Sequence, residues 1–380
     1  MTAVFLSVLN MSLTASYVIL FIILVRLPLK KAPRAVSYML WSVAAFRLLC
    51  PFSFESILSL VPMNAWPIPQ DIVYRQTPQI NSGITAVDTY VNSSLPAPIV
   101  GASVNPLQIY TRIGTDIWLL GIAVMLIYSA VSVLILKDRL KSARYTENGI
   151  YEADNLKTPF VLGLSRPRVF IPAGLSAEEK SYILRHEQTH IRRFDHIIKP
   201  FSFLILCIHW FNPMVWIAFV LMSTDMELSC DERVIKDMGG EGKRAYSASL
   251  LSLATERRVI NGGPLAFGEG NVRGRIKNVL NYQKPAFGIV VVAVIAVLFV
   301  GIGLIANPKA DKGSKTQDGA YKNQKQPVSL SDFVIAENSA ALSDGKNVSV
   351  RLVMTDGKYF DNGVTGGLNP ISSNSLGVLK

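Results

Sequence analysis

The chain contains little cysteine and histidine. Its 380 residues include three cysteines and four histidines. Cys50, Cys207 and Cys230 lie in or near apolar or cytoplasmic-type stretches and show no paired spacing. They therefore predict neither a disulfide framework nor a Cys-type zinc site.

Charged residues are also few, at 17% of the chain, and most are basic, which gives a formal net charge of +11. A basic chain suggests nucleic acid as a partner, but no basic patch interleaved with aromatic residues stands out. The Lys and Arg residues concentrate beside apolar stretches and in the segment after the third of them. Contact with anionic lipid and control of membrane topology explain this pattern better, so we expect no direct nucleic-acid binding.

Half of the residues are apolar, and they are bunched into long runs. A helix needs roughly 20 apolar residues to cross the hydrocarbon core of a bilayer. Four stretches qualify, at about 4–25, 36–61, 117–136 and 287–306. Arg47 and Glu55 interrupt the second stretch, and Pro51 should kink it. The composition predicts a multi-pass membrane protein.

The distribution of basic residues predicts its orientation. No basic residue precedes the first apolar run, and its basic cluster follows it, which favours a retained anchor with the N-terminus outside over a signal peptide. The clusters after the first and third runs should then be cytoplasmic: Arg26, Lys30, Lys31 and Arg34, and Lys137, Arg139, Lys141 and Arg144. The connection at about 62–114 has few basic residues, as expected for an exported loop.

The most informative motif is His-Glu-x-x-His, at His186, Glu187 and His190. On a helix, residues i and i+4 share a face, so both imidazoles can bind one zinc ion while Glu187 serves as the general base. A capping box from Ser176 to Glu179 predicts that this helix begins just upstream. The alternative is a helix with two ordinary histidines.

Two short β-rich runs precede the motif, at 160–163 and 169–172, around a turn that contains Pro167. A hairpin beside the active-site helix would suit a protease, because an edge strand can bind an extended peptide. A purely structural hairpin is the alternative.

A catalytic zinc site usually has three protein ligands, so a third is needed. On a helix that starts after Pro213, Glu227 and Asp231 share a face, which would let Glu227 ligate zinc while Asp231 orients a ligand histidine. Asp225 and Asp231 compete with Glu227 as ligands, and a solvated acidic face is the alternative for all three. If Glu227 meets the histidines, the apolar run 201–222 cannot cross the membrane. We expect a helical hairpin bent at Asn212 and Pro213.

Together these motifs resemble the BlaR/MecR-type membrane metallopeptidases, the sensor-transducers of antibiotic-resistance induction and their relatives. The resemblance covers about residues 1–306. It rests on the following ordered motifs: Pro159-Phe160-Val161-x-Gly163; Arg-His-Glu-x-x-His with Arg193 and Asp195 after it; His209-Trp210-Phe211-Asn212-Pro213; Glu227-x-x-Cys230-Asp231-Glu232; and Leu265-Ala266-Phe267-Gly268.

The resemblance implies His186, His190 and Glu227 as zinc ligands, Glu187 as the catalytic base and Asp231 near the metal. It implies a zinc endopeptidase at the cytoplasmic face of the bacterial plasma membrane that cleaves its own chain, with a BlaI/MecI-type transcriptional repressor as the regulated target, direct or indirect. The expected partners are a peptide or protein substrate, the lipid bilayer and, as an open question, a second copy of the chain. A housekeeping membrane protease and a non-catalytic receptor are the competing functions.

The tail departs from the antibiotic sensors, which carry a large extracellular penicillin-binding domain after the last membrane helix. The single Ser-x-x-Lys match begins at Ser343, in a polar Asp-Gly context typical of a turn. We therefore expect no stable acyl adduct with β-lactams. A truncated gene and a small unrelated sensor module both remain open.

The expected fold is mainly α, a polytopic membrane protein with about four transmembrane helices and a cytoplasmic gluzincin-like α+β zinc metallopeptidase domain. The expected divisions are a membrane region at 1–136, the zinc domain at 137–284 with its hairpin at 201–222, a fourth transmembrane helix at 285–306 and an extracellular tail at 307–380. The tail is expected to begin with a polar linker at 309–326 and to continue as a small β module with strand-like pieces such as 348–354.

Overall fold

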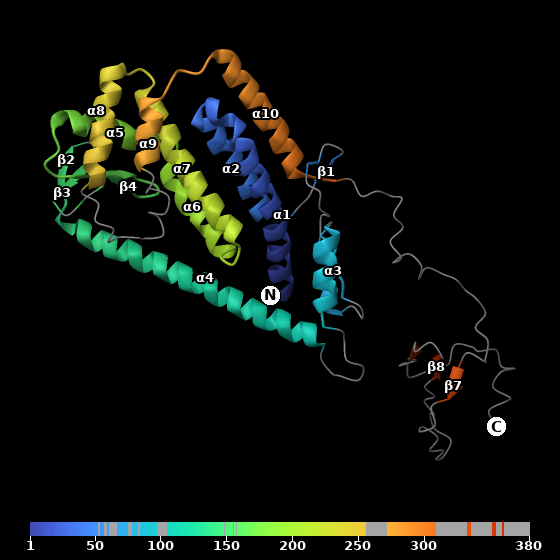
Figure 1. Ribbon diagram of the computed structural model, residues 1–380. Coiled ribbons are helices and arrows are strands. Elements are labelled where there is room, and N and C mark those ends of the chain that lie inside the picture. The colour runs from blue at the N-terminus through green and yellow to red at the C-terminus, as the bar shows by residue number, and fades with distance from the viewer. Residues whose placement is uncertain are drawn as a thin grey trace. The chain divides into compact units, whose positions relative to one another are not determined.

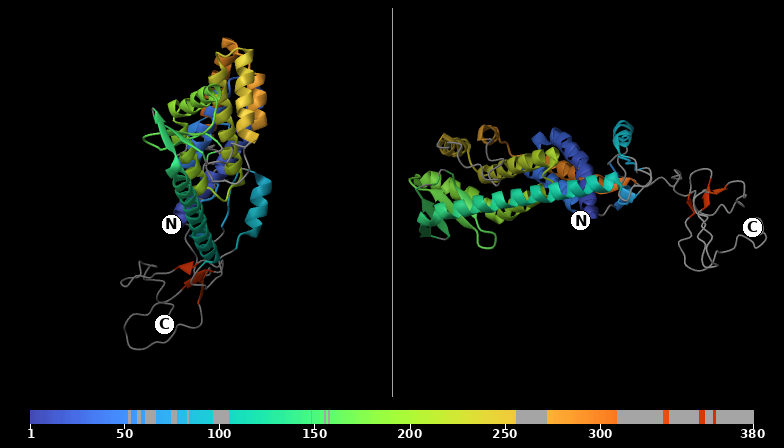
Figure 2. Two further views of the ribbon diagram at one scale, coloured as in Figure 1. Left: turned by 90° about the vertical axis from the view of Figure 1, so that its left-hand side faces the viewer. Right: turned by 90° about the horizontal axis from the view of Figure 1, so that it is seen from below.

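The computed structural model describes most of the chain, in two separate units (Figures 1 and 2). The first unit spans Met1–Ala310 and the second Asp311–Lys380. The described residues are 1–51, 54–56, 59–60, 67–74, 78–82, 84–96, 105–147, 149–154, 156, 158–255, 272–308, 333–335, 352–354 and 359–360.

Three helices in this part of the chain are long and apolar enough to cross a membrane. They are α1 (Thr2–Arg26), α4 (Pro106–Arg139) and α10 (Phe287–Ile305). These helices confirm that the first, third and fourth predicted apolar segments are helical and long enough to cross a membrane. Helix α4 begins earlier than the predicted end of the exported loop, because Asn105 caps it by accepting from the Leu107 amide and a proline follows at the first helical position.

The second predicted segment, 36–61, is wrong in its extent. Helix α2 (Arg34–Leu49) has 16 residues and stops before Pro51, because the residue before a proline is disfavoured in helical geometry and proline lacks an amide hydrogen. A helix of that length spans only about 24 Å, less than a hydrocarbon core of about 30 Å. It is followed by strand β1 (Phe54–Ser56), which pairs in parallel with β6 (Ala306–Pro308) directly after α10.

The connection between α2 and α4 contains further short elements within its described residues. These are the 3-10 turn Ile72–Tyr74 and the helix α3 (Thr85–Ser94). Two other 3-10 turns, Pro28–Lys31 and Leu140–Ser142, follow α1 and α4.

The break predicted at Asn212 and Pro213 is confirmed. Helix α6 (Asp195–Ile208) ends just before it and helix α7 (Pro213–Ile235) begins at the proline, with the Asn212 side chain accepting from the Met214 amide as the N-cap. The two helices pack against α1 and α2 around the largest apolar core, which includes the fully buried Ile19, Leu40, Leu206 and Met226. Figure 1 shows α1, α2 and α7 side by side, with α10 along α2.

A mixed four-stranded sheet precedes the motif helix. Its order is β2 (Arg144–Glu147), β3 (Ile150–Ala153), β5 (Arg168–Pro172) and β4 (Phe160–Leu162). The predicted hairpin is confirmed as the antiparallel pair β4–β5. Gly163 is needed in its turn, because its φ is +112° and a Cβ there would lie 2.6 Å from the Arg166 carbonyl oxygen.

Helix α5 (Ala177–Arg192) carries the His-Glu-x-x-His motif and lies against β4, α6, α7 and α8. Helices α8 (Gly240–Thr255) and α9 (Val272–Leu280) pack on each other and on α5 and α7, respectively. They share a small core with the end of α7 that includes Ile235, Tyr246 and Val279.

The second unit contains three short antiparallel strands among its described residues: β7 (Phe333–Ile335), β8 (Leu352–Met354) and β9 (Tyr359–Phe360). Strand β8 confirms the end of the strand predicted at 348–354. The predicted linker at 309–326 and the Ser343 turn lie outside the described residues.

Candidate metal centre

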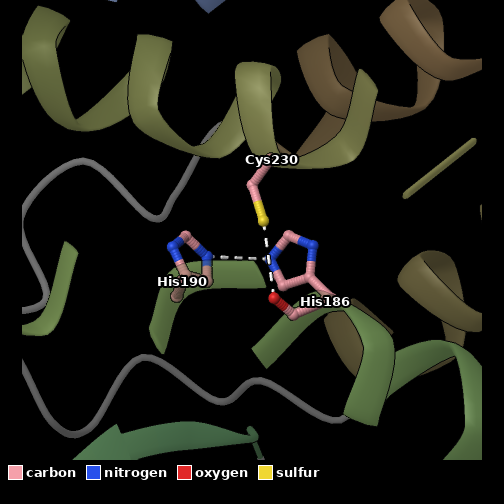
Figure 3. A group of neighbouring side chains, drawn as sticks. All are labelled: His186, His190 and Cys230. Carbon is pink, nitrogen blue, oxygen red and sulfur yellow. Dashed lines mark hydrogen bonds between the residues drawn. The ribbon is translucent and has the colours of Figure 1, made fainter. Parts of the chain in front are cut away.

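Helix α5 positions the two histidines of the motif. The capping box that begins it is present, with Ser176 and Glu179 each satisfying the other's backbone amide. His186 and His190 lie one turn apart on the buried face, and their Nε2 atoms are 3.1 Å from each other (Figure 3). Glu187 follows His186 on the same helix and is also buried.

His190 is oriented by Asp195, the first residue of α6. The Asp195 Oδ2 atom lies 2.8 Å from Nδ1 of His190. Since a carboxylate only accepts, Nδ1 carries the hydrogen and donates it, which leaves the lone pair of Nε2 facing His186. The contact depends on Phe194, whose left-handed backbone (φ 61°) turns the chain between α5 and α6. This conformation is uncommon for a residue with a Cβ and is found at sites where local strain is retained.

His186 is oriented by Tyr246 of α8 and Asp231 of α7. The Tyr246 hydroxyl lies 2.9 Å from Nδ1 of His186 and donates to Oδ1 of Asp231 at 2.7 Å. Because that hydroxyl gives its hydrogen to Asp231, it accepts from Nδ1–H of His186. Both Tyr246 and Asp231 are buried. The lone pair of Nε2 on His186 therefore also faces the space between the two rings.

Glu227 of α7 completes the group of acceptors around that space. Its carboxylate oxygens lie 3.5 Å from Nε2 of His186 and 3.7 Å from Nε2 of His190. Arg275 of α9 holds the same carboxylate, with Nη1 3.0 Å from Oε2 of Glu227. The guanidinium also pairs with Asp231 through Nε and Nη2, at 2.8 and 2.7 Å.

Two further groups on α7 bear on the ligand set: Asp225, a predicted competitor of Glu227, and Cys230, which the sequence did not place at a zinc site. The carboxylate of Asp225 is fully buried elsewhere, where Arg26 and Trp41 donate to its two oxygens. Cys230 is closer: one ligand atom from each of His186, His190 and Cys230 lies within 4.8 Å of the others (Figure 3). Its thiol donates to the carbonyl oxygen of His186 at 3.4 Å. Cys230 lies three residues after Glu227 on α7, a spacing that places the two residues close together on the helix surface.

The groups around the cluster favour positive charge on His190 and negative charge on the carboxylates of Glu227 and Asp231. Burial opposes ionisation of His190, but Cys230, Glu227 and Asp195 outweigh it and raise the pKa of His190 to about 10. Burial alone would raise the pKa of Glu227, yet Arg275 and the two histidines hold it well below its usual range. The same opposition, with Arg275 as the main favourable partner, lowers the pKa of Asp231 to about 2.

The donor set fits a zinc ion. The Nε2 atoms of two imidazoles and a carboxylate converge, and Nη2 of Arg275 also lies 3.2 Å from Nε2 of His186. Histidine nitrogen and carboxylate oxygen are ligand types that zinc binds. In a tetrahedral site with Zn–N bonds of about 2.0–2.1 Å, two ligand nitrogens lie about 3.3 Å apart, close to the 3.1 Å observed between the Nε2 atoms. In each ring the other nitrogen, Nδ1, donates its hydrogen to an acceptor, as in most histidine metal sites.

Three residues of the site escaped prediction from sequence or had no assigned role. Tyr246 and Arg275 come from helices 60 and 89 residues beyond His186 in the chain, and no spacing rule connects them to it. Asp195 had a detectable signal, since it lies just beyond the end of the motif helix. The predicted motif at Leu265 to Gly268 lies outside the described residues.

Two histidines face a carboxylate here, and the helices that carry them adjoin long apolar helices. This arrangement is typical of a membrane metallopeptidase. The profile of the BlaR1 peptidase M56 family matches residues 6–279, and the chain belongs to this family.

Curated relatives agree with that family. The regulatory protein BlaR1 of Bacillus licheniformis is 27% identical over 197 residues, which cover 45% of this chain and 33% of the relative. The methicillin resistance protein MecR1 of Staphylococcus aureus strain Mu50 is 27% identical over 141 residues, or 35% of this chain and 24% of the relative. The match thus spans a third or less of the length of these relatives.

Proposed function

We propose that the chain is a membrane zinc endopeptidase that cleaves peptide bonds at the cytoplasmic face. The observation that carries the proposal is the convergence of Nε2 of His186, Nε2 of His190 and the carboxylate of Glu227, with a fixed acceptor behind each ring. His186, His190 and Glu227 would hold the ion. The family match supports peptidase chemistry at this site.

When bound, zinc supplies Lewis-acid polarisation of the scissile carbonyl and lowers the pKa of water toward neutrality. Glu187 would accept the proton of the attacking water and pass it to the leaving amine. Asp195 and the Tyr246–Asp231 pair hold the two rings in the tautomers that ligate. Arg275 holds Glu227 and Asp231 in place.

The residues of the site come from several helices, which supports a location on one side of the membrane. Helices α5 and α7 both contribute to it, so their site-forming ends share a side, and the α6–α7 hairpin would enter the bilayer without crossing it. The basic residues that follow α1 and α4 favour the cytoplasm for that side. The sheet β2–β5 beside α5 would make this part a gluzincin-like α+β domain, with an edge strand available for an extended substrate.

A role in signalling is the more specific part of the proposal. The matched relatives are named as a regulatory protein and a methicillin resistance protein. We propose that the chain relieves a BlaI/MecI-type repressor by proteolysis and can cleave itself. A housekeeping protease with the same chemistry would lack this one substrate.

The test compares membranes that contain the intact chain with membranes that contain Glu187→Gln. Quantitative proteomics should show substrates cleaved only by the intact chain, while zinc analysis should show equal metal in both proteins. The matched control is Glu178→Gln, an exposed glutamate in the first turn of the same helix, which should cleave like the intact chain. Cleavage of the same substrates by Glu187→Gln would refute the assignment of the base.

A further inference from the structure

Helix α2 carries polar contacts at both ends, and each end reaches a different functional part of the chain. Arg34, Tyr38 and Trp41 lie at i, i+4 and i+7 and so share one face. Tyr38 meets Asp195, which contacts His190, and the other two meet Asp225 and Glu232 on the helix that carries Glu227. Arg47, near the other end, meets the last turn of α10.

The first of these contacts reaches His190. The Tyr38 hydroxyl donates to Oδ1 of Asp195 at 3.1 Å, while Oδ2 of the same carboxylate holds Nδ1 of His190 at 2.8 Å. Asp195 is almost fully buried, and the Arg193 guanidinium lies both near it, at 3.4 Å, and over the Tyr38 ring. A displacement of Tyr38 therefore moves the group that sets the direction of the His190 ring.

The second set of contacts reaches the helix of Glu227. Trp41 Nε1 donates to Oδ2 of Asp225 at 2.8 Å, and Arg26, at the end of α1, donates to Oδ1 at 2.6 Å. The backbone amide of Arg34 donates to Glu232 at 2.8 Å. Asp225 and Glu232 flank Glu227 in the sequence of α7 and, at i and i+7, share one face, so α2 holds that stretch of helix at two points.

The opposite end of α2 holds the exit of α10. Buried Arg47 donates through Nε to the carbonyl of Leu304 at 2.8 Å and through Nη2 to that of Ala306 at 2.9 Å. Ser59 donates to the same Ala306 carbonyl at 2.8 Å. These carbonyls end α10, where the helix leaves its last acceptors unpaired, and strand β6 follows directly.

We propose that α2 couples the exit of α10 to the metal centre, with Tyr38 as the positioning residue that acts on His190. The proposal rests on the proposed function. Tyr38 and Arg47 are nine residues apart, or about 14 Å along a helix, and α2 packs between α1, α7 and α10 over this length. A shift of the chain where it leaves α10 is thereby transmitted along one short rigid element to both zinc-binding helices.

The experiment measures zinc affinity of the purified full chain in detergent, by competition with a coloured chelator. Tyr38→Phe removes only the hydroxyl. It should weaken zinc binding about tenfold, which is the lower end of the loss in metal affinity typical when a group that supports a ligand is removed. Tyr17→Phe is the matched control, because Tyr17 packs partly buried against the same apolar core, and it should bind zinc like the intact chain.

The coupling is tested by a double-mutant cycle. Arg47→Lys keeps the charge but loses the planar fork of Nε and Nη2 that holds the two carbonyls. It should weaken zinc binding about threefold in the intact background and leave it almost unchanged in Tyr38→Phe, since linked residues are not additive. If Arg47→Lys fails to elute as a folded protein, Ser59→Ala provides the same cycle with a smaller change.

The outcomes separate the two levels of the proposal. Zinc bound by the intact chain, with equal affinity in Tyr38→Phe and Tyr17→Phe, would overturn the role of Tyr38 and leave the proposed function standing. Independent effects of Arg47→Lys and Tyr38→Phe would overturn the coupling. An intact chain that binds no zinc would refute the proposed function and the coupling with it.

Discussion

The Asp195 carboxylate offers a sharp test of how the metal centre is held. In Asp195→Asn the side chain keeps its size and its buried position, but one of its two oxygens becomes an amide that donates. If that amide faces Nδ1 of His190, the ring must carry its hydrogen on Nε2, the atom that would ligate zinc. If instead the oxygen faces the ring, the amide meets the Tyr38 hydroxyl and the charge assistance is lost.

Both arrangements should weaken the proposed zinc binding. Removal of such supporting groups typically costs 10- to 100-fold in metal affinity, or about 1.4–2.7 kcal/mol. We expect the upper half of that range, because Asp195 is almost fully buried and its contact with His190 is short, at 2.8 Å. Chelator competition on the purified chain measures the change directly, and proteolysis at saturating zinc should recover in part.

The control is Asp237→Asn at an exposed carboxylate whose partner is Lys284. It removes the same charge from the end of α7 and should leave zinc affinity unchanged, because exposed ion pairs contribute little. Equal affinities for Asp195→Asn and the intact chain would refute the assignment of His190 as a ligand oriented by Asp195.

Three further predictions test the ligands, the topology and the fold. Glu227→Ala should release zinc while Cys230→Ser retains it, as read by metal analysis; the reverse result would make Cys230 the third ligand. Single cysteines can be placed at Ser176 and at Lys236 in a background where Cys50, Cys207 and Cys230 are serine. Both should react with a membrane-impermeant thiol reagent only from the cytoplasmic side. Reaction from opposite sides would place α5 and the end of α7 on different sides of the membrane. Thermal unfolding in detergent should show Gly163→Ala as the most destabilising of three substitutions, by about 2–3 kcal/mol, because it adds a backbone clash to the strain of a positive φ. Gly174→Ala should cost about 1 kcal/mol from the strain of its positive φ alone, and Gly239→Ala should be neutral. Equal unfolding midpoints for all three would contradict the turn geometry at Gly163.

Local signals in the sequence predicted much of the fold. The capping box at Ser176, the proline that begins α7 and the apolar runs of α1, α4 and α10 depend on residues close in sequence, and the structure has each of them. The run 36–61 failed as one helix because hydropathy averages over a window and does not register the end of a helix. Pro51 carries the signal for that end, and it marks the end of α2 instead of the kink predicted there.

The candidate site divides in the same way. The i, i+4 spacing brings His186 to His190, and the same rule on α7 places Asp231 one turn after Glu227. Tyr246 and Arg275 depend on how α8 and α9 pack against the motif helix, and packing at that sequence separation leaves no local pattern. The contact of Tyr38 is harder still to predict from the sequence, because Tyr38 reaches His190 only through Asp195 and the left-handed turn at Phe194.

The measurement that tests the central claim most directly is X-ray absorption at the zinc edge of the purified, zinc-loaded chain. Two imidazoles and a carboxylate predict a first shell of nitrogen and oxygen at about 2.0–2.2 Å with the multiple scattering of two histidine rings. The spectrum should lose one histidine contribution in His190→Ala. A sulfur shell at about 2.3 Å would place Cys230 on the metal instead of Glu227, and a shell without histidine scattering would contradict a zinc centre at His186 and His190.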